Sequence, residues 1–447
     1  MKTDRWLLAL TTSALSSGIA GLLVPLYIVR LGGGAAQLGL SAALSSLVGA
    51  PGAILAGRYA DRTGNRRRVV LVALGVSALA LTTLPLVRAV PVVIAINAVL
   101  AFAIAAISPV VTMLVVDDAP ESAWNSRIAR LNQFQGYGTT LGFVVGTAFL
   151  VGAGAVLSTD TMQGVLFGLA ALFGIGAAVL AGMWLPGQSP PTVGPRRSDR
   201  IATLLTRTSR NVREATFSFG LARFFWSFKS LSRRPIRSIG RDIPRPLAVY
   251  FLAAFVFFTG FAAFWAPLPL FLTEREFTSA TIFGIYLVNN VGSTVLFGTA
   301  GRYADRYDVW HLQSSALGLR ALCFLAVGLL GIAGVSLLAG GSPTALAVVA
   351  FILVFVGASW AFIAITGTAI VSRLSPARVR GGILGIYGAL SAIAGAVGSL
   401  LGGWLASHGF EYAFGASVLL VLTGGATVVI ARQLTMPTQQ GPHGSPE

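Results

Sequence analysis

About twelve apolar stretches, each long enough to cross a lipid bilayer as a helix, follow one another along the 447-residue chain. A hydrocarbon core of about 30 Å requires roughly 20 such residues per helix, and a helix satisfies its own backbone hydrogen bonds. Charged residues make up only 11% of the chain, and its mean hydropathy is +0.78, whereas soluble domains carry about 25% charged residues. The sequence therefore predicts an all-α polytopic membrane protein.

The apolar stretches form two sets of six, one on each side of a basic segment. They lie at about 7–29, 36–57, 69–87, 91–116, 131–156 and 163–185, and at about 247–273, 280–301, 313–339, 344–372, 383–407 and 411–431. We therefore expect two six-helix bundles, at 1–185 and 246–434, joined by a cytoplasmic linker at 186–245. The Pro/Gln/Gly-rich tail, 435–447, is expected to be disordered.

The hexapeptide Gly-Arg-Tyr-Ala-Asp-Arg occurs at residues 57–62 and again at 301–306, 244 positions later. Each copy follows the second apolar run of its set of six. The repeat indicates two fused half-molecules, whose bundles we expect to be related by pseudo-twofold symmetry. Both copies are predicted to form turns at one face of the membrane.

Regularly spaced glycines give a second sign of duplication. Gly142 and Gly146 of the fifth span have counterparts in Gly398 and Gly402 of the eleventh, each 256 positions later. Together with Gly138, the first pair lies on one helix face, where small residues allow two helix backbones to approach closely. The alternative is that these glycines have only a general packing role.

The distribution of Lys and Arg predicts the orientation of the chain. If the amino terminus is cytoplasmic, only Arg30, Arg88 and Arg275 of the 32 Lys and Arg residues lie outside, and Arg320 lies within a span. Both termini are then cytoplasmic in a protein of the cytoplasmic membrane. The net charge of +17 fits the anionic inner leaflet better than nucleic acid. We interpret Arg320 as snorkelling to the cytoplasmic interface from about two turns into the ninth span.

The linker at 186–245 carries 13 Lys and Arg residues, and two interpretations of it are open. Phe217, Phe224 and Phe228 share one face of a helical projection, which is typical of an amphipathic helix lying in the membrane plane. A loosely ordered, solvated basic linker is the alternative.

Twelve spans in two sixes, a basic linker and the segment at 57–68 resemble the major facilitator superfamily of secondary transporters. The loop signature of that family reads Gly-x-x-x-Asp-Arg-x-Gly-x-Arg/Lys. The first copy matches it with Gly57, Asp61, Arg62, Gly64 and Arg66, and the second keeps Gly301, Asp305 and Arg306. In the family, such loops latch the two halves together on the cytoplasmic side when the binding site opens outward.

The resemblance implies this latch role for Asp61 and, by symmetry, for Asp305. We expect Asp61 to face the exposed N–H groups that open span 11 near Gly381, because a helix amino terminus favours negative charge. Asp305 would face the start of span 5 near Ser126. The alternative is that the basic residues beside these carboxylates only determine topology.

Neutral polar and aromatic side chains within the spans are candidates for the substrate cavity. They are Asn97, Asn132, Gln135, Trp265, Tyr286, Asn289, Asn290, Trp360 and Tyr387. Amides can hydrogen-bond a solute while aromatic rings enclose it, so we expect a neutral or amphiphilic organic solute. Each residue alone would also be compatible with helix packing.

The resemblance implies a monomeric, secondary active or facilitated transporter that works by alternating access, with export preferred. The fifth span lacks the Gly-Pro signature of many exporters in the family. The sequence has no phosphate-binding Gly-x-x-x-x-Gly-Lys-Ser/Thr loop, and its three histidines form no metal-ligand spacing. We therefore expect no enzyme activity, cofactor or metal, and leave coupling to protons or sodium open. A passive channel or scramblase and a non-transporting receptor or scaffold are the alternatives.

Overall fold

The computed structural model describes residues 5–117, 124–154, 156–185, 243–332, 343–376 and 380–435. Within these ranges twelve helices are long and apolar enough to cross a membrane, and no strand occurs. The predicted all-α polytopic fold is therefore confirmed. Most of the predicted linker and of the tail lie outside the described residues, so the in-plane helix and the tail remain predictions.

Six spans belong to each half of the chain. The first half contains α1 (Trp6–Arg30), α2 (Ala35–Thr63), α3 (Arg66–Thr83) with the short η1 (Leu84–Leu86), α4 (Val90–Asp117), α5 (Trp124–Ala153) and α6 (Thr159–Trp184). The second contains α10 (Arg245–Trp265), α11 (Leu268–Glu274), α12 (Ser279–Arg306), α13 (Val309–Ile332), α14 (Pro343–Leu374), α15 (Arg380–Ala406) and α16 (Phe410–Gln433).

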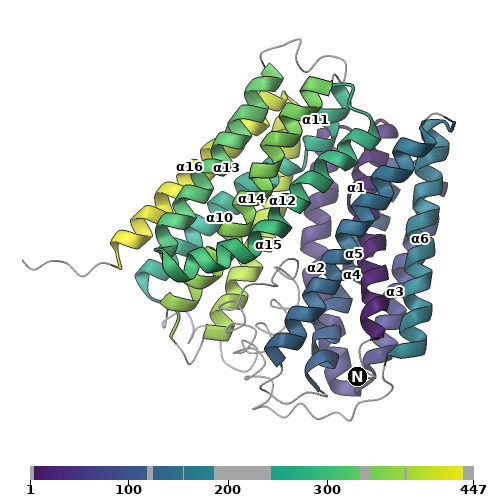
Figure 1. The fold of residues 1–447 in the computed structure, drawn as a ribbon, viewed down its shortest axis with the longest axis horizontal. Coiled ribbons are helices and arrows are strands. Elements are labelled where there is room, and N and C mark those ends of the chain that lie inside the picture. The colour runs from purple at the N-terminus through teal and green to yellow at the C-terminus, as the bar shows by residue number, and fades with distance from the viewer. Residues whose placement is uncertain are drawn as a thin grey trace, which may run out of the picture.

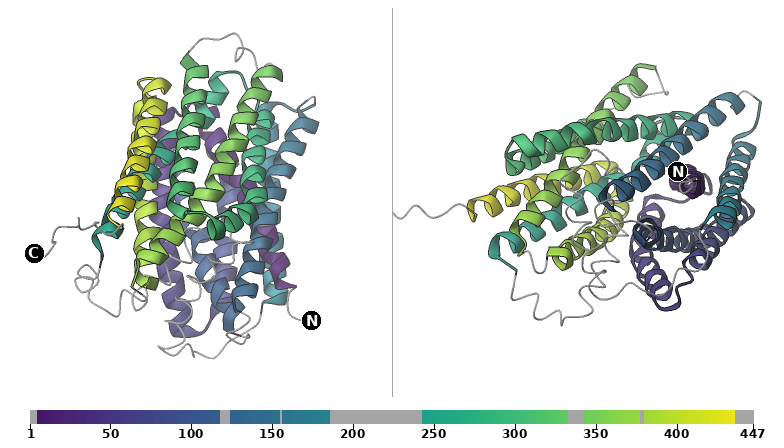
Figure 2. Two further views of the ribbon diagram at one scale, coloured as in Figure 1. Left: turned by 60° about the vertical axis from the view of Figure 1, so that its left-hand side comes forward. Right: turned by 60° about the horizontal axis from the view of Figure 1, so that its bottom comes forward.

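The helices of the two halves stand side by side, and they diverge toward the lower end in Figure 1. In Figure 2, α1 begins and α16 ends at this same end of the molecule. Because the spans alternate in direction, α2 and α12 also end there. We call this the GRYADR end, after the two repeats that it carries.

Both GRYADR copies are helical, which shows that the predicted turns are wrong. α2 continues to Thr63, and α12 continues to Arg306. Nothing in the repeat breaks a helix, since Ala and Arg are good helix formers and neither Pro nor an internal Gly interrupts it. Gly64 then ends α2 with φ of 69°, a left-handed conformation that costs little without a Cβ.

The seventh predicted span consists of two helices instead of one. α10 ends at Trp265, and the seven-residue α11 begins at Leu268. Pro267 and Pro269 lack the amide hydrogens that a continuous helix would use. The helix is therefore interrupted between Trp265 and Leu268.

The glycine-mediated approaches predicted for spans 5 and 11 are present. A methyl group added at Gly142 of α5 would lie 3.1 Å from the Gly18 Cα of α1. One added at Gly398 of α15 would lie 2.9 Å from the Ala262 Cβ of α10. Spans 1 and 5 of the first half thus pack in the same way as spans 7 and 11 of the second, as expected for duplicated bundles.

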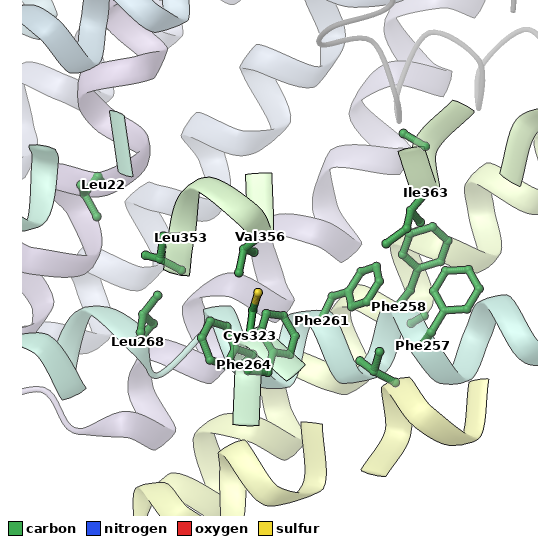
Figure 3. Close-up of a cluster of buried hydrophobic side chains, with 14 of the residues drawn as sticks. Leu22, Phe257, Phe258, Phe261, Phe264, Leu268, Cys323, Leu353, Val356 and Ile363 are labelled. Carbon is green, nitrogen blue, oxygen red and sulfur yellow. The ribbon is translucent and has the colours of Figure 1, made fainter. Parts of the chain in front are cut away.

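The interior of the second half is a cluster of aromatic side chains. Phe258, Phe261 and Phe264 project from α10 and are buried, and Figure 3 shows Phe264 beside Cys323 of α13, with Phe261 and Phe258 further along α10. Phe264 stacks on Phe324, with ring centroids 3.8 Å apart and an interplanar angle of 6°. These contacts join α10 to α13.

The two halves meet through α2 with α15 and through α5 with α12. A methyl group at Gly39 of α2 would lie 2.9 Å from the Gly403 Cα of α15, so the two backbones are in close contact. Between the other pair, the Thr140 hydroxyl donates a hydrogen bond of 3.1 Å to Asn290 Oδ1. The contact between Gly39 and Gly403 lies near the end remote from the GRYADR end. The hydrogen bond between Thr140 and Asn290 lies about midway along its helices.

Candidate functional site

A cavity of about 720 Å³ lies between the two halves. The first half contributes α1, α2 and α4, and the second contributes α10, α11, α12, α15 and the α10–α11 connection. All of the lining side chains are neutral. They are Ser17, Ala20, Gly21, Leu22, Pro25, Leu38, Ser41, Ala42, Ser45, Ser46, Gly49, Asn97, Leu100, Ala101, Ile104, Ala262, Trp265, Ala266, Pro269, Tyr286, Ala392, Gly395 and Ser399.

The polar side of the cavity is built on Asn97 of α4. Its Nδ2 donates hydrogen bonds of 3.0 Å to the hydroxyls of both Ser41 and Ser45, one turn apart on α2. Its Oδ1 accepts no hydrogen bond from the described residues. The two serines therefore orient the amide and leave its carbonyl oxygen to accept a hydrogen bond from a bound molecule.

The facing side of the cavity is aromatic. Trp265, at the end of α10, and Tyr286 of α12 pack edge to face with ring centroids 5.3 Å apart. Ala266, which directly follows α10, and Pro269, in the first turn of α11, continue this wall. A ring-bearing or apolar part of a solute would pack here, opposite the amide of Asn97.

The cavity is covered at the end remote from the GRYADR end. The contact between Gly39 and Gly403 lies there, and Ser399, one turn from Gly403, lines the cavity. The two helices approach this closely because neither position carries a side chain. The cover is therefore made by backbone atoms of both halves.

Three of the nine predicted cavity residues, Asn97, Trp265 and Tyr286, line this space. Asn290 instead bonds Thr140 across the interface of the halves, and Asn289 is its neighbour on α12. Asn132 and Gln135 lie on α5, the former buried and the latter half-buried.

Two more of the predicted residues, Trp360 and Tyr387, lie away from the cavity lining, in an aromatic cluster around Phe258. The Phe258 ring centroid lies 6.4 Å from that of Trp360 and 5.9 Å from that of Tyr387. Tyr387 is buried, whereas Trp360 is half-buried. These two rings are thus placed apart from Trp265 and Tyr286.

Sequence reasoning missed the serines of the cavity. On α2 the lining positions fall at 38, 41, 42, 45, 46 and 49, which is the spacing of a single helix face. Small and polar residues repeated at this spacing in an otherwise apolar span were the signal that could have identified them. Without the structure, each serine is equally consistent with a hydroxyl bonded to its own helix, as in Ser46 Oγ to the Ala42 carbonyl at 3.0 Å.

Arg320 does not snorkel, contrary to the sequence-based interpretation. It is the twelfth of the 24 residues of α13, so at 1.5 Å per residue it lies about 17 Å from the start of the helix. Its side chain is 3% exposed. Placing an arginine at the centre of a spanning helix costs about 2.5–3.5 kcal/mol on insertion scales, and the neighbouring helices must offset this cost.

Neutral groups surround the Arg320 guanidinium. Its Nε donates to Ser359 Oγ at 3.1 Å and its Nη2 to the Val356 carbonyl at 2.6 Å. Its Cζ lies 4.3 Å from the ring centroid of Phe261 and 5.6 Å from that of Trp360. The side chain thus joins α13 to α14 and α10 through hydrogen bonds and cation–π contacts.

The family model of the Major Facilitator Superfamily matches residues 6–366. The chain belongs to the major facilitator superfamily. This membership makes it a membrane transporter, not an enzyme. A search of curated proteins gave no significant match.

Solved transporters share the superfamily fold at low sequence identity. The human organic anion transporter MFSD10 is 18% identical, with a TM-score of 0.55, over 95% of this chain and 98% of its own. The nucleoside transporter NupG is 11% identical, with a TM-score of 0.69, over 97% and 99%. The xylose transporter XylE from E. coli is 14% identical, with a TM-score of 0.63, over 98% of both chains. At these identities the likeness shows the fold alone.

The residues of the superfamily's loop signature lie at the GRYADR end. Asp305 is exposed and makes no hydrogen bond or ion pair with the described residues. The side chain of Asp61 lies outside what the structure describes. The other members are buried at Gly57, Gly64, Arg66 and Gly301, and exposed at Arg62 and Arg306. Their latch role in this superfamily member remains a prediction.

Proposed function

We propose that this protein is a secondary active or facilitated transporter of a neutral or amphiphilic organic solute. The observation that carries the proposal is the neutral cavity of about 720 Å³ between the two halves. The volume falls within the range of small-molecule sites. Asn97 on one side and Trp265 with Tyr286 on the other suit a molecule with one polar and one apolar part.

The proposed mechanism is alternating access. The contact between Gly39 and Gly403 covers the cavity at one end, and the helices of the two halves diverge at the other (Figure 1). We assign the GRYADR end to the cytoplasm, because most arginines of the described ranges lie at that end. The conformer described is then inward-facing, and the opposite state requires the Gly39–Gly403 contact to separate.

The proposed setting is the cytoplasmic membrane with both termini inside, and the proposed direction is export. The basic linker would lie against the anionic inner leaflet. Coupling to protons or sodium is tested by imposing each gradient separately across proteoliposomes. Accumulation driven by one gradient supports active transport, and equilibration alone supports a facilitator.

Solute counterflow in proteoliposomes tests the function itself. Vesicles preloaded with an unlabelled solute should take up the labelled form transiently above its equilibrium level, because an alternating-access carrier exchanges one molecule for another. The solutes are a panel of neutral and amphiphilic organic molecules. Flux without counterflow would support a channel or scramblase, and binding without flux would support a receptor or scaffold.

A further inference from the structure

Arg320 carries a positive charge that the described residues do not neutralise. Its two hydrogen-bond acceptors, Ser359 Oγ and the Val356 carbonyl, are both uncharged. Nη1 donates no hydrogen bond to any described residue. In the sequence, every Asp and Glu lies outside the interior of the spans, so the neighbouring helices supply no carboxylate. A buried, unpaired charge in a membrane helix usually has a functional partner.

The surroundings of Arg320 leave it able to bind an anion. Its Cζ lies 4.3, 5.6 and 5.8 Å from the ring centroids of Phe261, Trp360 and Phe324. Aromatic rings attract a cation through their faces but accept no strong hydrogen bond. The N–H groups of a guanidinium lie in its plane, where a carboxylate or phosphate binds with two parallel hydrogen bonds.

Arg320 is connected to the wall of the central cavity through Phe261 of α10. Phe261, which it contacts, directly precedes Ala262, and Ala262 and Trp265 line the cavity one turn apart on α10. Figure 3 shows Phe261 between Phe258 and Phe264 along this helix. Trp360, the second ring over the guanidinium, is only half-buried. A change in the side-chain conformation of Phe261 or Trp360 would therefore open a path to Arg320.

We propose that Arg320 binds the acidic group of an amphiphilic solute, a carboxylate or a phosphate. The apolar part of the solute lies against Trp265 and Tyr286, and its acidic end reaches Nη1 of Arg320 past the rings of Phe261 and Trp360. This inference rests on the proposed function, since it specifies the chemical class of the same solute.

Paired ligands that differ only in charge test the proposal. The probes are 2-naphthoate with 2-naphthamide, indole-3-acetate with indole-3-acetamide, and phenyl phosphate with phenol. Binding to the purified protein is measured by calorimetry. We expect at least one acidic member to bind about tenfold more tightly than its neutral partner, because a charge-assisted contact to a buried arginine is lost in the neutral compound. Equal affinities within all three pairs would overturn the proposal.

Three variants test whether Arg320 is responsible for the preference for acidic probes. Arg320→Gln should abolish the preference for the acidic member, and Arg320→Lys, which keeps the charge without the planar fork, should retain part of it. Arg275→Gln is the matched control, because Arg275 also stacks on a phenylalanine, Phe271 at 5.4 Å, but does not line the cavity. A preference that survives in Arg320→Gln excludes Arg320. If Arg320→Gln does not fold, an unchanged preference in Arg320→Lys excludes the bidentate site.

The two proposals fail in different ways. If counterflow is observed but Arg320→Gln and wild type prefer the acidic probes equally, the protein is a carrier and Arg320 has only a structural role. If the preference depends on Arg320 but no solute shows counterflow, the anion site stands and the transport function fails.

Discussion

Gly39 of α2 and Gly403 of α15 bring the backbones of the two halves into contact, so that a Cβ on Gly39 would lie 2.9 Å from the Gly403 Cα. The contact contains no side chain that could rotate away. Its separation must move whole helices, as in the rigid-body rearrangements of alternating access. We therefore expect this pair to limit how tightly the cavity closes at the end remote from the GRYADR end.

Gly403→Val should shift the protein away from the conformer described. Overpacking a tight contact typically costs about 1–3 kcal/mol, and about 1.4 kcal/mol changes a two-state ratio tenfold. Spin labels on the GRYADR ends of α2 and α12 should report shorter distances, because that end closes as the other opens. Gly75→Ala is the control, since a Cβ at Gly75 would meet nothing within 4 Å. An unchanged distance distribution in Gly403→Val would show that the contact does not limit closure.

Asn97→Ala should weaken solute binding by about 1 kcal/mol, the usual net contribution of one hydrogen bond. The variant removes the carbonyl oxygen that we expect to face the solute and frees the hydroxyls of Ser41 and Ser45. Binding is measured by calorimetry with any solute that shows counterflow. Asn65→Ala, in the connection between α2 and α3 and outside the cavity lining, is the control. Equal affinities in wild type and Asn97→Ala would remove Asn97 from the site.

Variants of Trp265 and Trp360 separate the aromatic contacts with the apolar part of the solute from those beside Arg320. Trp265→Ala should weaken binding of both neutral and acidic solutes, because Trp265 lines the cavity beside Tyr286. Trp360→Ala should affect only the acidic solutes, because Trp360 covers Arg320. The same calorimetric panel tests both variants. The assignment is wrong if the two variants change the affinities of neutral solutes to the same extent.

The spans could be predicted from the sequence because hydropathy reports directly on burial in lipid, but their ends could not. α2 and α12 remain helical through charged GRYADR residues, since backbone hydrogen bonds do not depend on side-chain polarity. The interpretation of Arg320 as snorkelling was wrong for the same reason, because the start of its helix was placed too late. The apolar run of span 9 begins near residue 313, whereas α13 begins at Val309, one turn earlier. Counted from the true start, Arg320 is at the centre of the helix.

The cavity was only partly predictable because its lining depends on contacts between distant helices. Asn97 and Trp265 stand out as large polar or aromatic groups within apolar spans. Asn290 has the same appearance, but its amide oxygen accepts a hydrogen bond from Thr140 of the other half. The sequence of one span contains no information on which polar group meets a partner and which meets open space.

The orientation of the chain predicts which cysteines an impermeant thiol reagent can reach. The native Cys323 is buried and is first replaced by alanine. Cysteines at Thr63 and Tyr307, both exposed at the GRYADR end, should react only after the membrane is permeabilised. A cysteine at Val156, exposed at the opposite end, should react in intact cells. The reverse pattern would invert the proposed topology.

The latch role expected for Asp61 can be tested by removing the charge of its side chain. If its carboxylate attracts the amino terminus of α15 when the GRYADR end is closed, Asp61→Asn keeps the shape of the side chain but loses the charge. The loss is about 0.3–1 kcal/mol at an exposed site and up to roughly 2 kcal/mol when partly buried. The populations should shift toward the inward-facing conformer, because the lost contact stabilises only the opposite state. Spin labels at the GRYADR ends of α2 and α15 should therefore report longer distances.

Asp305→Asn is the comparison for this measurement. Its repeat has Asp308 where the first copy has Gly64, and Asp308 is already engaged in an ion pair, with its Oδ2 2.9 Å from Arg432 Nη2. We therefore expect Asp305→Asn to lengthen the corresponding distance, between α5 and α12, by less than Asp61→Asn lengthens its own. If Asp61→Asn leaves the distance distribution unchanged, Asp61 serves topology or folding, and closure of the GRYADR end depends on other contacts between the halves.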